Sequence, residues 1–153
     1  MRLLLACLCG CAGLGAWASV AGEPAAPTVW TENFEQAKTA NKDGRVLLLY
    51  FTGSDWCDWC TKLDQDVFAQ KEFQDWAKKK VILVQLDYPR KKAQTERLRE
   101  QNILLQVVHE ITEFPTVVFL DKGGNELGKL KYQSGGPTDW IKAAEKIIAK
   151  AKK

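Results

Sequence analysis

The sequence has little of what several large classes of protein need. Its 153 residues include one histidine, and its formal net charge is only +3. A charge so close to neutral gives no reason to expect binding to nucleic acid or to an acidic membrane surface. No internal repeat is visible, and hydrophobic residues make up 46% and charged residues 27% of the chain. This ordinary balance argues against a disordered chain and, at this length, predicts one globular domain.

The N-terminus is strongly apolar. Residues 1–21 (M-R-L-L-L-A-C-L-C-G-C-A-G-L-G-A-W-A-S-V-A) have one basic residue, then an apolar run, then small residues that form two possible cleavage sites, Ala16–Ala18 and Ser19–Ala21. This pattern is typical of a secretory signal peptide. The apolar run is shorter than the ~20 residues of a membrane-spanning helix. A lipoprotein signal is the alternative, in which the acylated residue would be Cys7, Cys9 or Cys11.

Cysteine is scarce after this segment, which holds three of the five cysteines in the chain. Cleavage near Ala21 would leave Cys57 and Cys60, one possible internal pair, in a compartment that permits disulfides. We expect residues 22–29 to be a linker and residues 30–153 to form one domain, a monomer. A domain of this size buries about two-thirds of its unfolded surface and does not need a disulfide to fold. The pair is therefore free to open and close.

Strand and helix patterns alternate along the rest of the chain. Apolar runs predict buried strands at 46–51 and 81–87 and a third strand at 116–120, and a turn of hairpin composition at 121–126 predicts a returning strand at 127–132. Helical spacing predicts a short first helix capped by Thr31 or Asn33, then helices near 61–68, 73–80, 93–110 and 137–148. The helix near 93–110 is expected to have one apolar side, made of Leu98, Ile103, Leu105 and Val108. This order predicts an α/β domain with a mixed central sheet of about four to five strands and helices on both faces.

The two cysteines lie in W-C-D-W-C, between a predicted strand and a predicted helix. Cys57 falls at or just before the first helical residue, where backbone N–H groups have no internal partner and the helix dipole is positive. Both features stabilise a thiolate, so we expect Cys57 to have a lowered pKa and to be the attacking sulfur. Cys60, one turn further along the same face, suits the resolving role in an exchange that proceeds through a mixed disulfide.

Three other uses of the pair compete with redox exchange. Zinc sites usually take four ligands, and only His109 is available besides the two cysteines. A copper-handling site of two thiolates and this histidine is the better metal hypothesis, because soft thiolates suit Cu(I). His109 lies among apolar residues and is more readily explained as a packing residue. A permanently closed structural disulfide would span a very short loop, where the entropic stabilisation is small.

A second informative stretch is E-F-P-T-V, where Pro115 opens an apolar strand. Proline is confined to edges, bulges and first residues of strands. A proline in this place is a candidate for a cis peptide bond, although a trans proline at the end of a loop is the commoner case.

Together these stretches resemble the thioredoxin superfamily, and more narrowly a bacterial group of exported thioredoxin-like proteins. The matching residues are Trp56–Cys60 after a buried strand, Phe114–Thr116 before another, and Gly135-Gly136 before the last helix. The resemblance implies a thioredoxin fold from about Trp30 onward. It also implies that Cys57 is the nucleophile, that Cys60 resolves the mixed disulfide, and that Pro115 is a cis-proline beside it. The backbone at Phe114 would pair with a bound peptide, and Gly135 would complete the substrate site. We also expect Trp56 and Trp59 to flank the sulfurs as an apolar platform for flexible client segments; in the alternative interpretation, Trp59 is a packing residue.

Three departures from the thioredoxin pattern concern the direction of exchange. Asp58-Trp59 stands where thioredoxins have Gly-Pro, Tyr50 falls at the place of a buried aspartate, and the segment 89–101 is longer and more basic. The carboxylates of Asp55 and Asp58 add negative charge near Cys57. We therefore expect a less acidic thiol than in strongly oxidising relatives and a lean towards reductase or isomerase activity. In the alternative interpretation, both aspartates only solvate the surface and cap the helix.

The sequence thus predicts an exported, periplasmic thiol–disulfide oxidoreductase, or a lipid-anchored one that faces the periplasm. It needs no metal and no cofactor, because the dithiol is the redox centre. Its substrates would be protein thiols and disulfides, and a membrane or soluble electron donor would recharge it. The alternative functions are a copper-handling thiol protein and a redox-inert binding module with the same fold.

Overall fold

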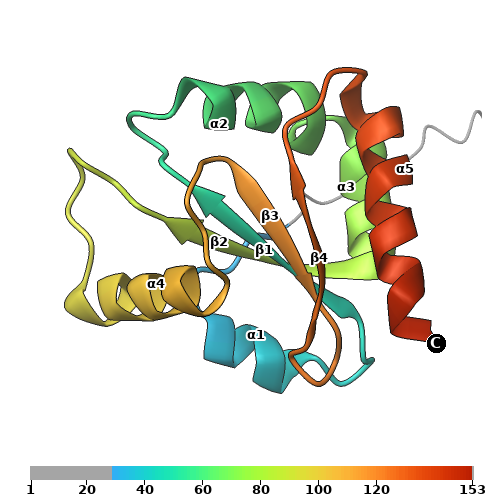
Figure 1. Cartoon of the computed structure of the whole chain (residues 1–153), viewed down its shortest axis with the longest axis horizontal. Coiled ribbons are helices and arrows are strands. Elements are labelled where there is room, and N and C mark those ends of the chain that lie inside the picture. Colours follow the sequence, from blue (N-terminus) through green and yellow to red (C-terminus); the bar gives the residue numbers. More distant parts are fainter. Residues whose placement is uncertain (1–28, 153) are drawn as a thin grey trace, which may run out of the picture.

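The computed structural model describes residues 29–152, so the expected signal peptide and nearly all of the expected linker lie outside the described residues. Four strands form one sheet in the order β2-β1-β3-β4. They are β1 (Val46–Thr52), β2 (Val81–Asp87), β3 (Thr116–Leu120) and β4 (Glu126–Lys131). β1 is parallel to β2 and antiparallel to β3, and β4 is antiparallel to β3. The sheet is therefore mixed, as the order of elements predicted (Figure 1).

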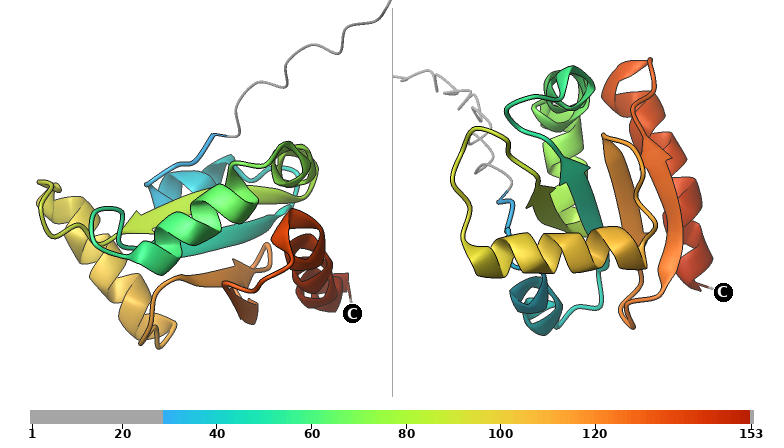
Figure 2. Two further views of the ribbon diagram at one scale, coloured as in Figure 1. Left: turned by 90° about the horizontal axis from the view of Figure 1, so that it is seen from above. Right: turned by 60° about the vertical axis from the view of Figure 1, so that its left-hand side comes forward.

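Five α-helices surround the sheet in the part of the chain that the structure describes (Figure 2). They are α1 (Phe34–Ala40), α2 (Asp58–Leu63), α3 (Lys71–Lys80), α4 (Glu96–Val108) and α5 (Gly136–Ile148). Asn33 caps α1 as predicted, since its side-chain oxygen accepts the N–H of Gln36 at 2.9 Å. A π-helical turn, Asp64–Phe68, separates α2 from α3, and a short 3-10 turn follows α5.

β1 is buried along its whole length because the sheet has a hydrophobic core on each face. Leu48 and Tyr50 point to the face covered by α2, α3 and α5, where Trp140 of α5 is fully buried. Leu47, Leu49 and Phe51 alternate with them and pack against residues of α1 and α4. A strand covered on both faces reads as the continuous apolar run seen in the sequence.

The apolar side predicted for α4 is wrong for two of its four members. Ile103 is 47% exposed and Val108 is 61% exposed. The inward face is formed by Leu105 together with two polar residues, Asn102 and His109, at helical spacing. The Asn102 amide donates to the carbonyl of Asp87 at 2.9 Å, so a hydrogen bond satisfies this buried polar group.

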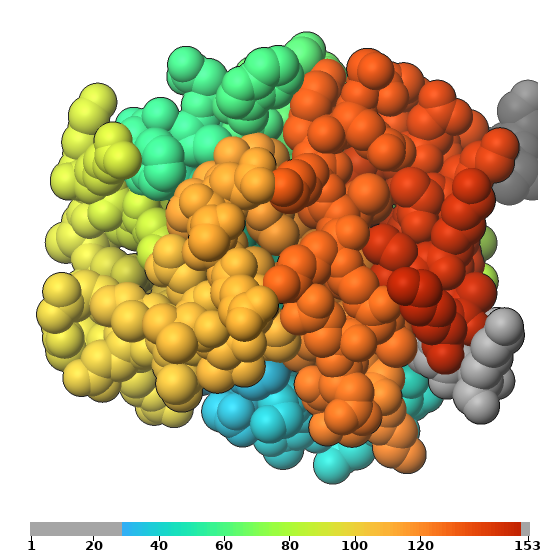
Figure 3. All heavy atoms as spheres, viewed as in Figure 1, coloured from blue at the N-terminus to red at the C-terminus, as the bar shows by residue number. Residues whose placement is uncertain are grey.

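The loops that form the candidate site lie together at one end of the sheet. The parallel strands β1 and β2 end there, with Thr52 paired to Asp87. The turn into α2 follows β1, and the segment 88–95 follows β2. In Figure 3 the green surface of α2 lies beside the orange segment that leads into β3. No helix among residues 29–152 is long and apolar enough to span a membrane.

Candidate active site

Cys57 and Cys60 form a disulfide at the start of α2, with their Cα atoms 5.2 Å apart. Cys57 is the N-cap residue of this helix, and its sulfur accepts the backbone N–H of Cys60 at 3.2 Å. Cys57 is 8% exposed and Cys60 only 1%. Cys57 is thus the more accessible residue of the two, and its sulfur lies at the positive end of the helix, where a thiolate is stabilised.

Trp56 forms the wall between the disulfide and the neighbouring loops. Its indole N–H donates to the carbonyl of Tyr88 at 2.7 Å, and its ring lies edge-on to Phe114 at 5.6 Å between centroids. A Cβ at Gly53 would come within 2.3 Å of the indole, so glycine leaves the space in which Trp56 lies. The Tyr88 ring also packs edge-on against Phe114, at 5.2 Å. These contacts fix the aromatic side chains beside Cys57.

A groove of about 270 Å³ lies next to this wall. Its lining joins α2, the segment before β3, and β4: Trp59, Glu113, Phe114, Pro115, Lys131 and Tyr132. The Phe114–Pro115 peptide bond is cis. Trp59 is 59% exposed and its ring lies 5.3 Å from that of Tyr132. Lys131 and Glu113 form an ion pair across the groove. Glu113, Lys131 and Tyr132 were not predicted as site residues, because β4 meets the groove only through its pairing with β3.

Gly135 does not line this groove. It has φ +110° and is the N-cap residue of α5, where a Cβ would come within 2.3 Å of the Asp139 carboxylate. A glycine is therefore required for the turn into α5. Its predicted part in substrate binding stays a prediction.

Asp55 contacts the loop that follows β2. Its carboxylate accepts the backbone N–H groups of Arg90, Lys91 and Lys92 at 2.9, 2.7 and 3.2 Å. These hydrogen bonds, that of Arg90 first, hold the pKa of Asp55 below its usual value. Asp58 is exposed in the first turn of α2. Of the two aspartates, Asp58 is therefore the one with a carboxylate directed to solvent.

Two titratable groups lie behind the resolving cysteine. The phenol of Tyr50 donates to the carbonyl of Cys60 at 3.2 Å, and burial raises the pKa of Tyr50 well above its usual value. Burial also raises the pKa of Asp64 to about 6. Asp64 was not predicted as a site residue. Its position four residues after Cys60 could have indicated it, because residues four apart are neighbours on a helix.

His109 does not lie with the cysteines. It is buried at the C-cap of α4, and its Nδ1 lies 2.9 Å from a carboxylate oxygen of Glu126. Residues 29–152 contain no group of three or more histidine, cysteine or acidic residues placed to hold a metal ion. The copper hypothesis of two thiolates with His109 therefore lacks its third ligand, and the interpretation of His109 as a packing residue agrees with its contacts.

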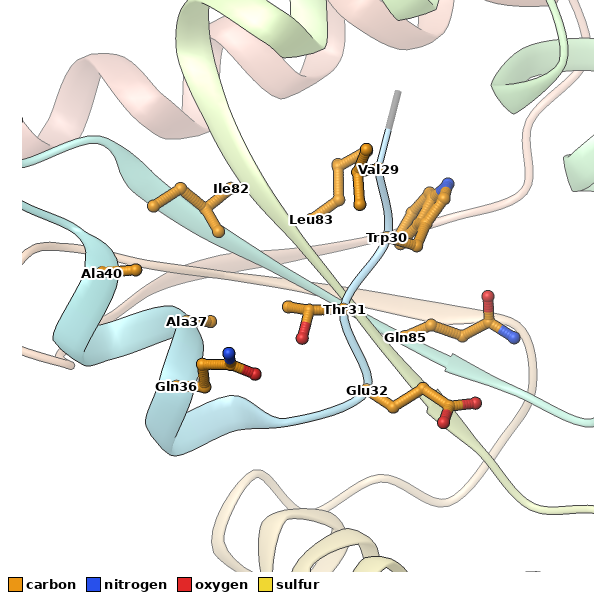
Figure 4. A pocket seen from close by; sticks show the side chains of 10 residues that line it. All are labelled: Val29, Trp30, Thr31, Glu32, Gln36, Ala37, Ala40, Ile82, Leu83 and Gln85. Atoms are coloured by element: carbon orange, nitrogen blue, oxygen red, sulfur yellow. The ribbon is translucent and has the colours of Figure 1, made fainter. Parts of the chain in front are cut away.

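A larger cavity, of about 680 Å³, lies on another part of the molecule. Side chains from residues 29–32, α1 and β2 line it (Figure 4). Among the described residues that line it, Glu32 is the only ionisable one, and none of the predicted site residues reaches it. It contributes nothing to the chemistry of the disulfide.

Comparisons with known proteins agree with this geometry. Residues 34–139 match the profile of a family described as a thioredoxin-like domain. The disulfide bond reductase DsbH of Chlamydia pneumoniae is 31% identical over 124 residues, which are 81% of this chain and 75% of that protein. The thioredoxin-related protein DsbJ of the same organism is 29% identical over 103 residues, 67% of this chain and 30% of that protein. A solved structure of a DsbH oxidoreductase superposes with a TM-score of 0.76 at 30% identity, and covers 81% of this chain and 86% of that one. The predicted fold is confirmed.

Proposed function

We propose that this chain, which belongs to the thioredoxin-like domain family and is a thiol–disulfide oxidoreductase, reduces disulfide bonds in other proteins. The observation that carries the proposal is the placement of Cys57. Its sulfur caps α2, accepts the N–H of Cys60 at 3.2 Å, and is the more exposed of the pair. Such a sulfur can become a thiolate and reach a partner, while Cys60 remains shielded behind it.

The exchange would run in two displacements. In the reduced protein, the Cys57 thiolate attacks one sulfur of a client disulfide; the client S–S bond breaks and its second sulfur leaves as a thiolate. The Cys60 thiol then loses its proton and attacks the Cys57 sulfur of the mixed disulfide. This step releases the client's remaining thiol and forms the Cys57–Cys60 disulfide, the state present in the structure. Two electrons have passed to the client, and a donor must supply two more for the next cycle.

The groove lined by Trp59, Phe114 and Pro115 is the proposed binding place for the client. Trp56, Trp59 and Phe114 offer apolar surface to a flexible segment, and the backbone at Phe114 would pair with it beside Pro115. Two exposed or half-buried tryptophans can bury a large apolar area at little cost in conformational entropy. This arrangement favours an extended or unfolded client segment.

The direction of exchange is inferred from the charge at the start of α2. Asp58 in its first turn adds negative charge near the Cys57 thiolate, which weakens the preference for the reduced form. The name of the relative from Chlamydia pneumoniae, disulfide bond reductase, agrees with a reductive role. We further propose export to the periplasm through residues 1–21, with a membrane or soluble protein as electron donor.

Reduction of insulin by dithiothreitol, followed as turbidity, tests the activity. The wild-type chain should accelerate the reaction, and Cys57→Ala should not. Cys60→Ala, reduced beforehand, freed of dithiothreitol and then mixed with insulin, should instead trap a mixed disulfide between Cys57 and the insulin chain, visible by non-reducing electrophoresis. A wild-type protein without this activity that binds copper when purified under reductant would refute the proposal in favour of metal handling.

A further inference from the structure

Three consecutive basic residues, Arg90, Lys91 and Lys92, lie in the loop after β2 beside the redox site. All three side chains are exposed. Within residues 29–152, none of them forms an ion pair with a carboxylate, whereas Lys62 and Lys131 near the groove are each paired. This tribasic loop therefore presents positive charge to solvent.

The tribasic loop is fastened to the turn that carries Cys57. The Asp55 carboxylate binds its three consecutive backbone N–H groups, and the carbonyl of Tyr88 binds the indole N–H of Trp56 at 2.7 Å. The carboxylate of Asp55 is thus directed at the loop backbone, and the side chains of the loop are left to point outward. A loop held by this many bonds keeps its charges at a fixed place relative to the disulfide.

The nearest of these charges lies directly over a residue of the site. The guanidinium carbon of Arg90 is 3.9 Å from the centre of the Trp56 ring, and Trp56 precedes Cys57. The ammonium of Lys92 lies 3.3 Å from the hydroxyl of Ser54, in the same turn. Three carboxylates lie in this region besides Asp55: Asp87, which accepts from Ser54, the exposed Asp58, and Glu32, which lines a pocket together with Asp87 and Lys92.

The two sides of the site consequently differ in charge. On the β4 side, Lys131 is paired with Glu113, so that wall is close to neutral. On the Trp56 side, the three cationic side chains are exposed, whereas the carboxylates of Asp55 and Asp87 accept from backbone N–H groups and from Ser54 and offset part of this charge. A client segment that leaves Cys57 across Trp56 passes the exposed guanidinium of Arg90 first.

We infer that the site selects acidic clients: cysteines flanked by aspartate or glutamate on the side that crosses Trp56. The inference rests on the proposed reductase function and adds a substrate class to it. Exposed charges of opposite sign raise the rate of encounter and orient the partner more than they tighten the complex. The preference should therefore appear in kcat/KM and should weaken with salt.

Synthetic peptides with one cysteine test the inference directly. Each carries glutamates, glutamines or lysines around the cysteine, which is joined in a disulfide to 5-thio-2-nitrobenzoate. The reduced protein attacks the mixed disulfide, releases the coloured thiolate, and then frees the peptide thiol as Cys57–Cys60 closes. Three surface charges should make the glutamate peptide about fivefold faster than the glutamine peptide at low salt. At half-molar salt the ratio should fall below about twofold, because the Debye length is then only a few ångströms.

Paired variants locate the effect in the tribasic loop. Lys91→Gln with Lys92→Gln should remove most of the preference and leave the rate with the glutamine peptide unchanged. Lys91→Glu with Lys92→Glu should make the lysine peptide the faster one. The matched control is Lys42→Gln with Lys79→Gln, two exposed lysines that precede β1 and β2 at the opposite end of the sheet. This control removes the same net charge and should keep the preference.

The outcomes separate the two proposals. If no peptide releases the coloured thiolate, the reductase function fails. If the glutamine peptide is reduced but the glutamate peptide has no advantage, only the acidic-client inference fails. A preference that disappears equally in the control pair would belong to the net charge of the protein and would overturn the role of the loop.

Discussion

Reduction of the Cys57–Cys60 disulfide should lower the stability of the protein by a predictable amount. The bond closes the four-residue loop from Cys57 to Cys60, and even so short a loop removes about 6 cal/mol/K of unfolded-state entropy, or about 2 kcal/mol at 25 °C. Stabilisation of the thiolate in the reduced form offsets part of this difference in stability. A Cys57 thiolate at the N-cap of α2, with the Cys60 N–H directed at it, is worth up to about 1 kcal/mol. The oxidised form should therefore be more stable by about 1–2 kcal/mol.

Thermal unfolding of the two redox forms measures this difference. A domain of this size has an unfolding entropy of about 0.26 kcal/mol/K, so the oxidised form should melt about 4–7 °C higher. The difference should grow at low pH. A thiol whose pKa is lowered by folding stabilises the reduced form above its unfolded pKa of about 8.5, and this contribution disappears as the pH falls through the folded pKa.

A variant with both cysteines changed to serine supplies the control, because added reductant should leave its melting temperature unchanged. A reduced wild type that melts above the oxidised one would refute the reasoning. It would mean that thiolate stabilisation exceeds the loop entropy, as expected of an oxidant rather than a reductase. A difference that shrinks at pH 5 would show that Cys57 is not stabilised as an anion.

Three further changes test separate parts of the site. Asp58→Asn should lower the pKa of the Cys57 thiol by about half a unit, as thiolate absorbance against pH would measure; an unchanged pKa would end the argument from charge. Tyr50→Phe removes the hydrogen bond to the Cys60 carbonyl and should lower the melting temperature by about 4 °C, which corresponds to ~1 kcal/mol. No shift would mean that this bond contributes nothing net. Asp64→Asn should flatten the pH dependence of urea unfolding between about pH 4 and pH 6. The raised pKa of Asp64, about 6, makes its ionisation cost stability in that window. The cost should be ~1 kcal/mol or less, because this partly desolvated side chain keeps contact with solvent, which screens the effect; a wild type equally stable at both pH values would contradict this.

Strands β1 and β3 could be predicted because they are buried at every position and most of their consecutive residues are apolar. Leu47 to Phe51 alternate between two cores, and only a strand covered on both faces needs apolar side chains at every position. The inner face of α4 was not predictable in the same way. Its buried positions include Asn102, whose hydrogen bond to Asp87 joins residues fifteen apart in the chain, so counting apolar residues selected the exposed side instead.

The part of the site that could be predicted depends on local contacts, and the rest depends on contacts between residues far apart in the chain. Cys57 and Cys60 lie within one helical turn, and the helix start that positions them follows from the strand and turn before it. The groove needs Lys131 and Tyr132, which reach it because Thr116 of β3 pairs with Lys131 of β4. A pairing register of this kind is not encoded in any short stretch of sequence.

The hydrogen bonds between Asp55 and the tribasic loop depend on the pairing register of β1 and β2. Thr52 and Asp87 are partners at the ends of the parallel strands β1 and β2, and the segments that follow them leave the sheet there in the same direction. Asp55 is three residues beyond Thr52, and Arg90 is three residues beyond Asp87, so equal lengths of chain bring the carboxylate and the first N–H together. Lengthening either segment by one residue would shift this match, release the loop from Trp56, and remove the fixed positive charge on which the acidic-client preference depends.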